Sequence, residues 1–191
     1  MTSPDGPMGA TVRLLGKAGL PPGDLGELPS SSKRFSDGRQ WKVEIPSVEG
    51  PEALAVVLEE ADARDIKVDR ASQGSGIMLL TDPEIRRMVE LGTANDVEVC
   101  LFTGPRAAWD IGRQAVTAAG SVAQTTLRGQ DQVRYAIEDV RHGCALGVRS
   151  VLVADLGLLH VLAEAKRAGD LPSDLVLKTS VSLPCTVTAR G

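Results

Sequence analysis

The sequence predicts an α/β fold of parallel strands, part of a (β/α) barrel of the TIM type with about five βα units, preceded by a flexible N-terminal tail. Short apolar runs alternate with stretches that repeat apolar residues at helical spacing. The run at residues 97–102 is nearly continuously apolar, which is typical of a strand buried on both faces. Glu44 and Lys178 fall inside presumed strands, where an inward side chain near the carboxyl end faces a barrel mouth.

Residues 1–40 are predicted to form a disordered or loosely docked tail, followed by a partial barrel domain at residues 41–191. The tail is rich in glycine, proline and serine, so ordering it costs conformational entropy and buries little apolar surface in return. Gly16 and Gly19 weaken any helix in this region.

The first half of the domain is predicted to begin with a strand at residues 41–45, which ends at Pro46. A helix follows at residues 51–65, where leucine and valine recur at helical spacing. A second strand is expected at residues 66–69, and a polar, glycine-rich turn at residues 72–76.

A short apolar segment at residues 77–80 then leads to a second helix. We expect Asp82 to cap this helix, with Pro83 at its first position and Gly92 at its end. The third strand is the apolar run at residues 97–102.

The second half is ambiguous at residues 106–128, which could hold a helix or a long excursion. Beyond it the pattern predicts a helix at residues 130–146, a strand at 151–154, a helix at 158–168 and a strand at 175–179. Strands that alternate with helices in this way indicate βαβ units with right-handed crossovers.

A doubly wound nucleotide-binding sheet is the competing architecture. It should carry a GxGxxG turn directly after its first strand, and residues 46–50 lack one. Residues 74–76 read Gly-Ser-Gly, but no third glycine follows at the required spacing. Because a barrel needs eight strands and five are predicted, either the chain is a fragment of a barrel or the sheet stays open, and we favour the fragment.

Composition limits the class of protein. The 191 residues suggest one domain, and 25 acidic against 21 basic residues give a net charge of -4. We therefore expect no nucleic-acid partner, because backbone phosphates require a basic surface. The start lacks the pattern of a secretory signal, no apolar run is long enough to span a membrane, and the three cysteines form no CxxC pair. We expect a reduced, cytoplasmic protein without membrane association.

Residues 147–159, Gly-Val-Arg-Ser-Val-Leu-Val-Ala-Asp-Leu-Gly-Leu-Leu, resemble a characteristic stretch of the U32 peptidase-like family. Leu177-Lys178-Thr179-Ser180 is similar to the next strand of that family, and Glu44-Ile45-Pro46 is similar to the opening strand. The resemblance implies the N-terminal half of a (β/α)8-type barrel. Members include proteins named as proteases and others linked to hydroxylation of RNA or of a quinone precursor, some with an iron–sulfur cluster. The chain has no cluster-like cysteine spacing, and the sequence identifies no cofactor.

Three residues are candidates for catalysis. Glu44 could act as a general base in the lumen, although a structural ion pair is the stronger alternative. Asp155 could serve as acid, base or metal ligand where a strand becomes a helix, or it could cap that helix. Lys178 could form a Schiff base with a carbonyl substrate, or it could reach solvent or pair with Glu44.

Candidate substrate-binding residues follow the predicted strands: Gln73, Ser75, Thr103 and Ser180. The turn that contains Gln73 and Ser75 could hold a phosphate or carboxylate on its backbone N–H groups, or it could be a plain flexible loop. No metal site is predicted, since His142 and His160 are the only histidines and give no usual ligand spacing.

The leading hypothesis is a U32 peptidase-like barrel enzyme that acts on a peptide or small molecule at the carboxyl ends of its strands. A non-catalytic binding subunit of a heteromeric barrel enzyme is one alternative, and a Schiff-base lyase that uses Lys178 is another. Five strands leave two sheet edges unpaired, so we also expect a protein partner, an oligomer or aggregation.

Overall fold

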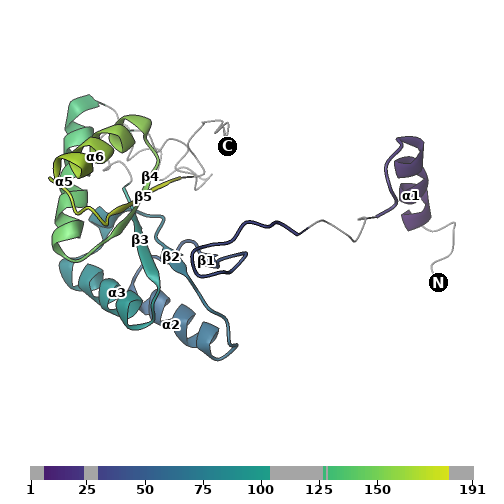
Figure 1. Ribbon diagram of the computed structural model, residues 1–191, viewed down its shortest axis with the longest axis horizontal. Helices are drawn as coiled ribbons and strands as arrows, with labels where there is room; N and C mark the ends of the chain where they lie inside the picture. The colour runs from purple at the N-terminus through teal and green to yellow at the C-terminus, as the bar shows by residue number, and fades with distance from the viewer. Residues whose placement is uncertain (1–6, 24–29, 104–126, 128, 181–191) are drawn as a thin grey trace. The chain divides into compact units, whose positions relative to one another are not determined.

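The computed structural model describes residues 7–23, 30–103, 127 and 129–180 (Figure 1). The chain divides into two compact units, Met1–Trp41 and Lys42–Gly191. The N-terminal unit contains helix α1 (Pro7–Lys17), which runs through Gly16. One glycine costs a helix only about 1 kcal/mol, so Gly16 does not break α1. The left-handed Gly19, with φ 72°, follows its end.

The second unit is an α/β fold. Its described residues form a five-stranded sheet of β1 (Glu44–Ile45), β2 (Arg70–Ser72), β3 (Glu98–Phe102), β4 (Ser150–Val153) and β5 (Val176–Thr179). All pairs of neighbouring strands are parallel, and the order β1-β2-β3-β4-β5 follows the chain. A doubly wound sheet reverses its order at a switch point. This sheet has no reversal in its described strands, as expected for part of a barrel.

Helices occupy the connections between the strands: α2 (Pro51–Asp62), α3 (Asp82–Ala94), α5 (Gly129–Ala145) and α6 (Leu156–Ala168), with the short 3-10 helix η1 (Ile77–Leu79) before α3. Figure 1 shows them along one side of the strands. Right-handed crossovers that always advance in one direction put their helices on the same face. The predicted alternation of parallel strands and helices is therefore confirmed.

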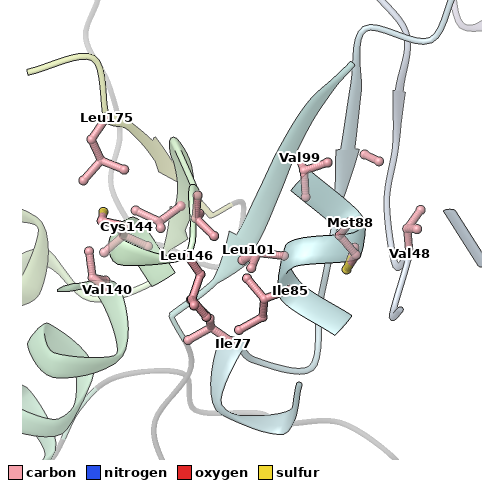
Figure 2. Packing of buried hydrophobic residues seen from close by; sticks show 14 of the residues in the cluster. Val48, Ile77, Ile85, Met88, Val99, Leu101, Val140, Cys144, Leu146 and Leu175 are labelled. Atoms are coloured by element: carbon pink, nitrogen blue, oxygen red, sulfur yellow. The ribbon is translucent and has the colours of Figure 1, made fainter. Parts of the chain in front are cut away.

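The hydrophobic core lies between this helical layer and the facing side of the sheet (Figure 2). Strands contribute Ala71, Val99, Leu101, Val151 and Val153, and helices contribute Leu54, Ile85, Met88, Val140, Leu158 and Leu162. Each large apolar side chain that is fully buried stabilises the fold by about 1.5–3 kcal/mol. Apolar packing therefore attaches the helices to one face of the sheet. The other face carries a different set of residues.

The second strand lies later than predicted, at Arg70–Ser72 and not at residues 66–69. Ile66 is 46% exposed and belongs to the connection before β2. Asp69 accepts a hydrogen bond from the Val43 N–H at 2.8 Å. The prediction was wrong because β2 carries polar residues, so the apolar content of the sequence peaks before the strand begins.

Helix α3 also departs from its predicted ends. Its N-cap is Thr81, whose N–H donates to the Glu84 carboxylate at 2.7 Å, while Asp82 lies inside the first turn. The helix continues through Gly92. A Cβ on Gly92 would lie 2.6 Å from Val99 Cγ2, so this glycine allows close packing of α3 on β3.

The remaining elements match the prediction within a few residues. The last turn predicted for the first helix is absent, because α2 ends at Asp62. Helix α6 begins at Leu156, two residues earlier than expected, because Asp155 is its N-cap. The ambiguous stretch at residues 106–128 lies outside the described residues except for Leu127.

Candidate functional site

The face of the sheet that points away from the helices, here called the inner face, carries a group of polar residues. Alternation along the strands places seven residues with charged, hydroxyl or thiol groups on it: Glu44, Arg70, Ser72, Glu98, Cys100, Ser150 and Lys178. Three apolar residues, Phe102, Leu152 and Val176, share this face. The interior of a TIM barrel is usually filled by branched apolar side chains. Charged and hydroxyl groups in their place make the inner face the candidate site.

The lower part of the inner face, toward the amino ends of the strands, holds an ion pair and a hydroxyl group that donates to it. Arg70 donates from Nε to Glu98 Oε1 at 2.9 Å and from Nη2 to Oε2 at 2.9 Å. The Ser150 hydroxyl donates to the same carboxylate. These residues begin β2, β3 and β4, so they lie toward the amino ends of the strands, where barrel residues usually serve stability.

The upper part of the inner face centres on Glu44. Its carboxylate accepts hydrogen bonds from Ser72 Oγ at 2.6 Å, from Lys178 Nζ, and from Arg70 Nη1 at 3.4 Å. The side chains of Glu44 and Lys178 are 31% and 25% exposed, so both remain accessible to a ligand. We call Glu44, Ser72 and Lys178 the upper cluster. The ion pair that the sequence offered as an alternative is present.

The contact between Glu44 and Lys178 requires strong curvature. They lie on β1 and β5, the two outer strands of the sheet. In a flat sheet four strand spacings of about 4.8 Å would separate these strands by about 19 Å, more than the two side chains can bridge. In an eight-stranded barrel the first and fifth strands lie opposite one another across the lumen. The sheet is therefore curved in the manner of a barrel wall.

The stagger of the strands supports the same geometry. Glu44 pairs with Arg70, and Arg70 pairs with Glu98. When the registers of the next two strand pairs are extended in the same way, this row of paired residues reaches Asp174, just before β5. Lys178 lies four residues beyond Asp174, across four steps between strands. A stagger of about one residue per strand equals the shear of 8 over the eight strands of a TIM barrel.

The charges of the inner face balance. Burial alone would raise the pKa of Glu44, but hydrogen bonds from Lys178 and Ser72 and the nearby positive charges outweigh it and leave the pKa lowered. Burial likewise opposes ionisation of Glu98, and hydrogen bonds from Arg70 and Ser150 leave its pKa lowered as well. The hydrogen bond to Glu98 raises the pKa of Arg70. At neutral pH the inner face thus holds two carboxylates beside two cations.

Cys100 lies on the inner face between Ser72 and Ser150, and the sequence analysis did not select it. It is fully buried, and burial raises the pKa of its thiol in spite of the neighbouring hydroxyls and positive charges. A thiol in this state is a poor nucleophile. The available signal was its spacing of two residues from Glu98, which places both on one face of β3.

Asp155 lies at the carboxyl end of β4 and caps α6. Its Oδ1 accepts the Leu158 N–H at 2.7 Å, and its Oδ2 accepts the Leu127 N–H at 3.1 Å. Both carboxylate oxygens therefore bind backbone donors. This arrangement is the helix cap that the sequence offered as the alternative to a chemical role.

The four candidate binding residues lie at the carboxyl ends of β2, β3 and β5. The buried Gln73 donates from Nε2 to Ser75 Oγ at 2.9 Å and to the Gly76 carbonyl at 3.0 Å. Thr103 Oγ1 donates to the Leu152 carbonyl at 3.0 Å. The Ser180 N–H donates to the Val153 carbonyl at 2.8 Å. These contacts order the rim, and the charged groups of the upper cluster lie deeper on the inner face.

Metal ligands do not gather in the described part of the chain. Within these residues no group of three or more histidine, cysteine, aspartate or glutamate side chains is placed to hold an ion. No helix in the described ranges is long and apolar enough to cross a bilayer.

Comparisons with known proteins add little to this geometry. No family model matches the chain, and no curated protein matches its sequence. Among solved structures, a chain named for copper homeostasis, CutC from Streptococcus agalactiae, is similar at 12% identity with a TM-score of 0.43. The match covers 72% of this chain and 58% of that one. A likeness of this size carries no argument, so the barrel assignment rests on strand order, stagger and the contact between Glu44 and Lys178.

Proposed function

We propose that the chain is part of a barrel enzyme that hydrolyses a bond next to a carbonyl group, in a peptide or a small molecule, at the upper cluster. The observation that carries this proposal is the meeting of the Glu44 carboxylate with the Lys178 ammonium on the half-buried inner face. Lys178 lies near the carboxyl end of β5, the end at which the active sites of TIM barrels are found, and Glu44 begins β1 and contacts Lys178 there.

The two charged groups suit the two needs of such a reaction. The Glu44 carboxylate takes a proton from a water molecule, and the oxygen of that water forms a bond to the carbonyl carbon. The Lys178 ammonium stabilises the negative charge that develops on the carbonyl oxygen. The bond to the leaving group then breaks, and Glu44 returns its proton to that group. The lowered pKa keeps Glu44 ionised at neutral pH, and it also makes the carboxylate a weaker base than an ordinary glutamate.

The finer form of the proposal is a peptidase related to the U32 peptidase-like family. It is supported by the resemblance of residues 147–159 and 177–180 to that family. In this form Asp155 positions helix α6 and the end of β4, and Gln73, Ser75, Thr103 and Ser180 shape the rim that receives the substrate.

The test is hydrolysis of a mixed peptide library by the 191-residue chain, followed by mass spectrometry. Glu44→Gln keeps the size of the side chain and removes its basic oxygen, so we expect the rate to fall about 10²- to 10⁴-fold. Lys178→Met should also lower the rate. Glu60→Gln is the matched control, because Glu60, on α2, forms an exposed ion pair with Arg64, just beyond the end of the helix.

Three results count against the proposal. They are no cleavage by the native chain, cleavage by Glu44→Gln at the native rate, or an equal loss in the Glu60→Gln control.

A binding subunit of a heteromeric barrel is the second candidate function. The open edges of the sheet favour it, because β1 and β5 each pair on one side only among the described strands. Edges of this kind accept a strand from another chain. Light scattering of the purified chain, alone and with candidate partners, separates the cases: a monomer that never associates contradicts the subunit.

The Schiff-base lyase has less support. Lys178 donates to the Glu44 carboxylate, and an ammonium held in an ion pair lacks the free electron pair that attacks a carbonyl carbon. Borohydride treatment with a panel of aldehydes and ketones tests it directly. A stable adduct on Lys178 would favour the lyase over the hydrolase.

A further inference from the structure

The loop after β2 holds a carboxylate on its backbone. The Gly74 N–H donates to Glu49 Oε1 at 3.1 Å, and the Ser75 N–H donates to Glu49 Oε2 at 3.0 Å. Two successive N–H groups that bind one oxygen each form a nest of the kind that receives phosphates and carboxylates. Here the anion comes from the connection between β1 and α2.

The loop is open to solvent and shaped for close approach. Glu49, Gly74 and Ser75 are all exposed. A Cβ on Gly74 would lie 3.2 Å from Glu49 Oε1 and 3.8 Å from Ser47 Oγ, so a side chain there would crowd the bound oxygen. Ser47 itself has φ 56°, a backbone conformation that costs a residue other than glycine about 1 kcal/mol or more. Strain of this kind gathers at ligand sites.

A buried acceptor beneath the same loop is unsatisfied. Gln73 Nε2 donates to the Gly76 carbonyl, which fixes the orientation of the amide, because the opposite orientation would set two oxygens against each other. Gln73 Oε1 is buried and finds no hydrogen-bond partner among the residues that the structure describes. Native proteins rarely leave such an atom unpaired. An oxygen of this kind needs a hydrogen-bond donor, so a binding site for an anion at this loop rests on the N–H groups of Gly74 and Ser75 and not on Gln73.

We infer that Gly74 and Ser75 form a binding site for a ligand oxyanion, a carboxylate or a phosphate, and that Glu49 occupies this site until the ligand displaces it. The inference deepens the proposed function, since the loop follows Ser72 of the upper cluster directly. It names the substrate class as one that carries an anionic oxygen group. Glu49 then acts as an internal competitor that lowers the affinity for weak anions.

The experiment is an NMR titration of the Gly74 and Ser75 amide signals in the 191-residue chain. Sodium phosphate and sodium acetate are the two probes, each added at constant ionic strength. Glu49→Ala removes the competitor. Glu52→Ala is the matched control, because it removes one exposed negative charge three residues away and makes no contact with the two N–H groups. The same titration is repeated with Glu49→Gln, which keeps the length of the side chain and removes its charge.

If Glu49 fills the site for at least about four-fifths of the time, its removal raises the apparent affinity by about fivefold or more. We expect this gain in Glu49→Ala relative to the native chain and to Glu52→Ala. A gain for phosphate alone, for acetate alone or for both supports the inference and identifies the anion. Amide signals that do not move in Glu49→Ala, or that move equally in Glu52→Ala, overturn it. The titration needs no turnover, so it can succeed where hydrolysis at Glu44 fails, and the reverse also holds.

Discussion

Glu44 on β1 pairs with Lys178 on β5, although these are the first and last strands of the described sheet. Their sequence separation is 134 residues, so no local pattern couples them. The pair joins the two ends of a curved wall, and Ser72 and Arg70 bind the same carboxylate. This one contact is therefore evidence for the curvature of the sheet, and it also forms the centre of the candidate site.

The Glu44–Lys178 pair should contribute measurably to stability. Each side chain is less than one-third exposed, so removal of either one leaves a partly buried charge without its partner. We expect Lys178→Met to lower the free energy of unfolding by about 1–3 kcal/mol. A double-mutant cycle with Glu44→Gln, followed by urea unfolding, should give a favourable coupling energy.

The exposed pair of Glu60, on α2, and Arg64, just beyond the end of that helix, is the reference for that cycle. Exposed ion pairs couple weakly, because water competes for both charges. A coupling energy for Glu44 and Lys178 no larger than that of the reference would show that the inner face does not hold them together.

Acid should destabilise the protein through the two inner carboxylates. The pKa values of Glu44 and Glu98 are lowered from the ordinary value of 4.5. A lowered pKa in the folded state gives stability that is fully present above the unfolded pKa and is lost as pH falls through the folded pKa. The free energy of unfolding should therefore be constant near neutral pH and fall once the pH drops below about 4.5.

Urea unfolding between pH 7 and pH 3 measures this dependence. Glu98→Gln removes one of the two titrating groups, so its curve should start lower and fall less steeply. An unchanged slope in Glu98→Gln would mean that Glu98 is not ionised against Arg70 in the folded protein.

Asp155 should behave as a helix cap. Alanine removes the acceptor for the Leu158 N–H, so Asp155→Ala should cost about 0.5–2 kcal/mol of stability. Asparagine keeps an acceptor and caps nearly as well, so Asp155→Asn should retain most of the stability and any hydrolytic activity. A variant Asp155→Asn that is fully stable and yet inactive would instead make Asp155 a chemical group.

Gly92 should not tolerate a side chain. A Cβ there would lie 2.6 Å from Val99 Cγ2 and 2.7 Å from the Val97 carbonyl oxygen, and the backbone atom cannot move away cheaply. Gly92→Ala should destabilise the fold by about 1–3 kcal/mol. Gly50→Ala is a suitable control, because its nearest contact would be 3.7 Å and its backbone is extended. Equal thermal stability of the two variants would contradict the close packing of α3 on β3.

The sequence predicted the alternation of strands and helices because that signal is local. Apolar periodicity located β3, β4 and β5 and their helices within a few residues. It misplaced β2, because the residues of that strand are chosen for partners far along the chain: Arg70 binds Glu98 and Ser72 binds Glu44. Periodicity carries no information about partners of this kind.

In the candidate site, too, the sequence identified the residues with a local signal and missed those whose role depends on distant partners. Glu44 and Lys178 could be selected from sequence because charges are unusual inside strands. Arg70, Glu98 and Cys100 were missed, because their common face follows from the pairing of β2 with β3. The roles of Glu49 and of the open Gln73 oxygen depend on how two loops approach, which only the structure describes.

A crystal structure of the 191-residue chain tests the central claim most directly, through the distance between the Glu44 carboxylate and Lys178 Nζ. The curved, barrel-like wall predicts direct contact within ion-pair distance, with β1 to β5 parallel and in chain order. A sheet in which β1 and β5 stand apart by about 19 Å, the width of four flat strand spacings, with Glu44 and Lys178 each turned to solvent, would contradict it.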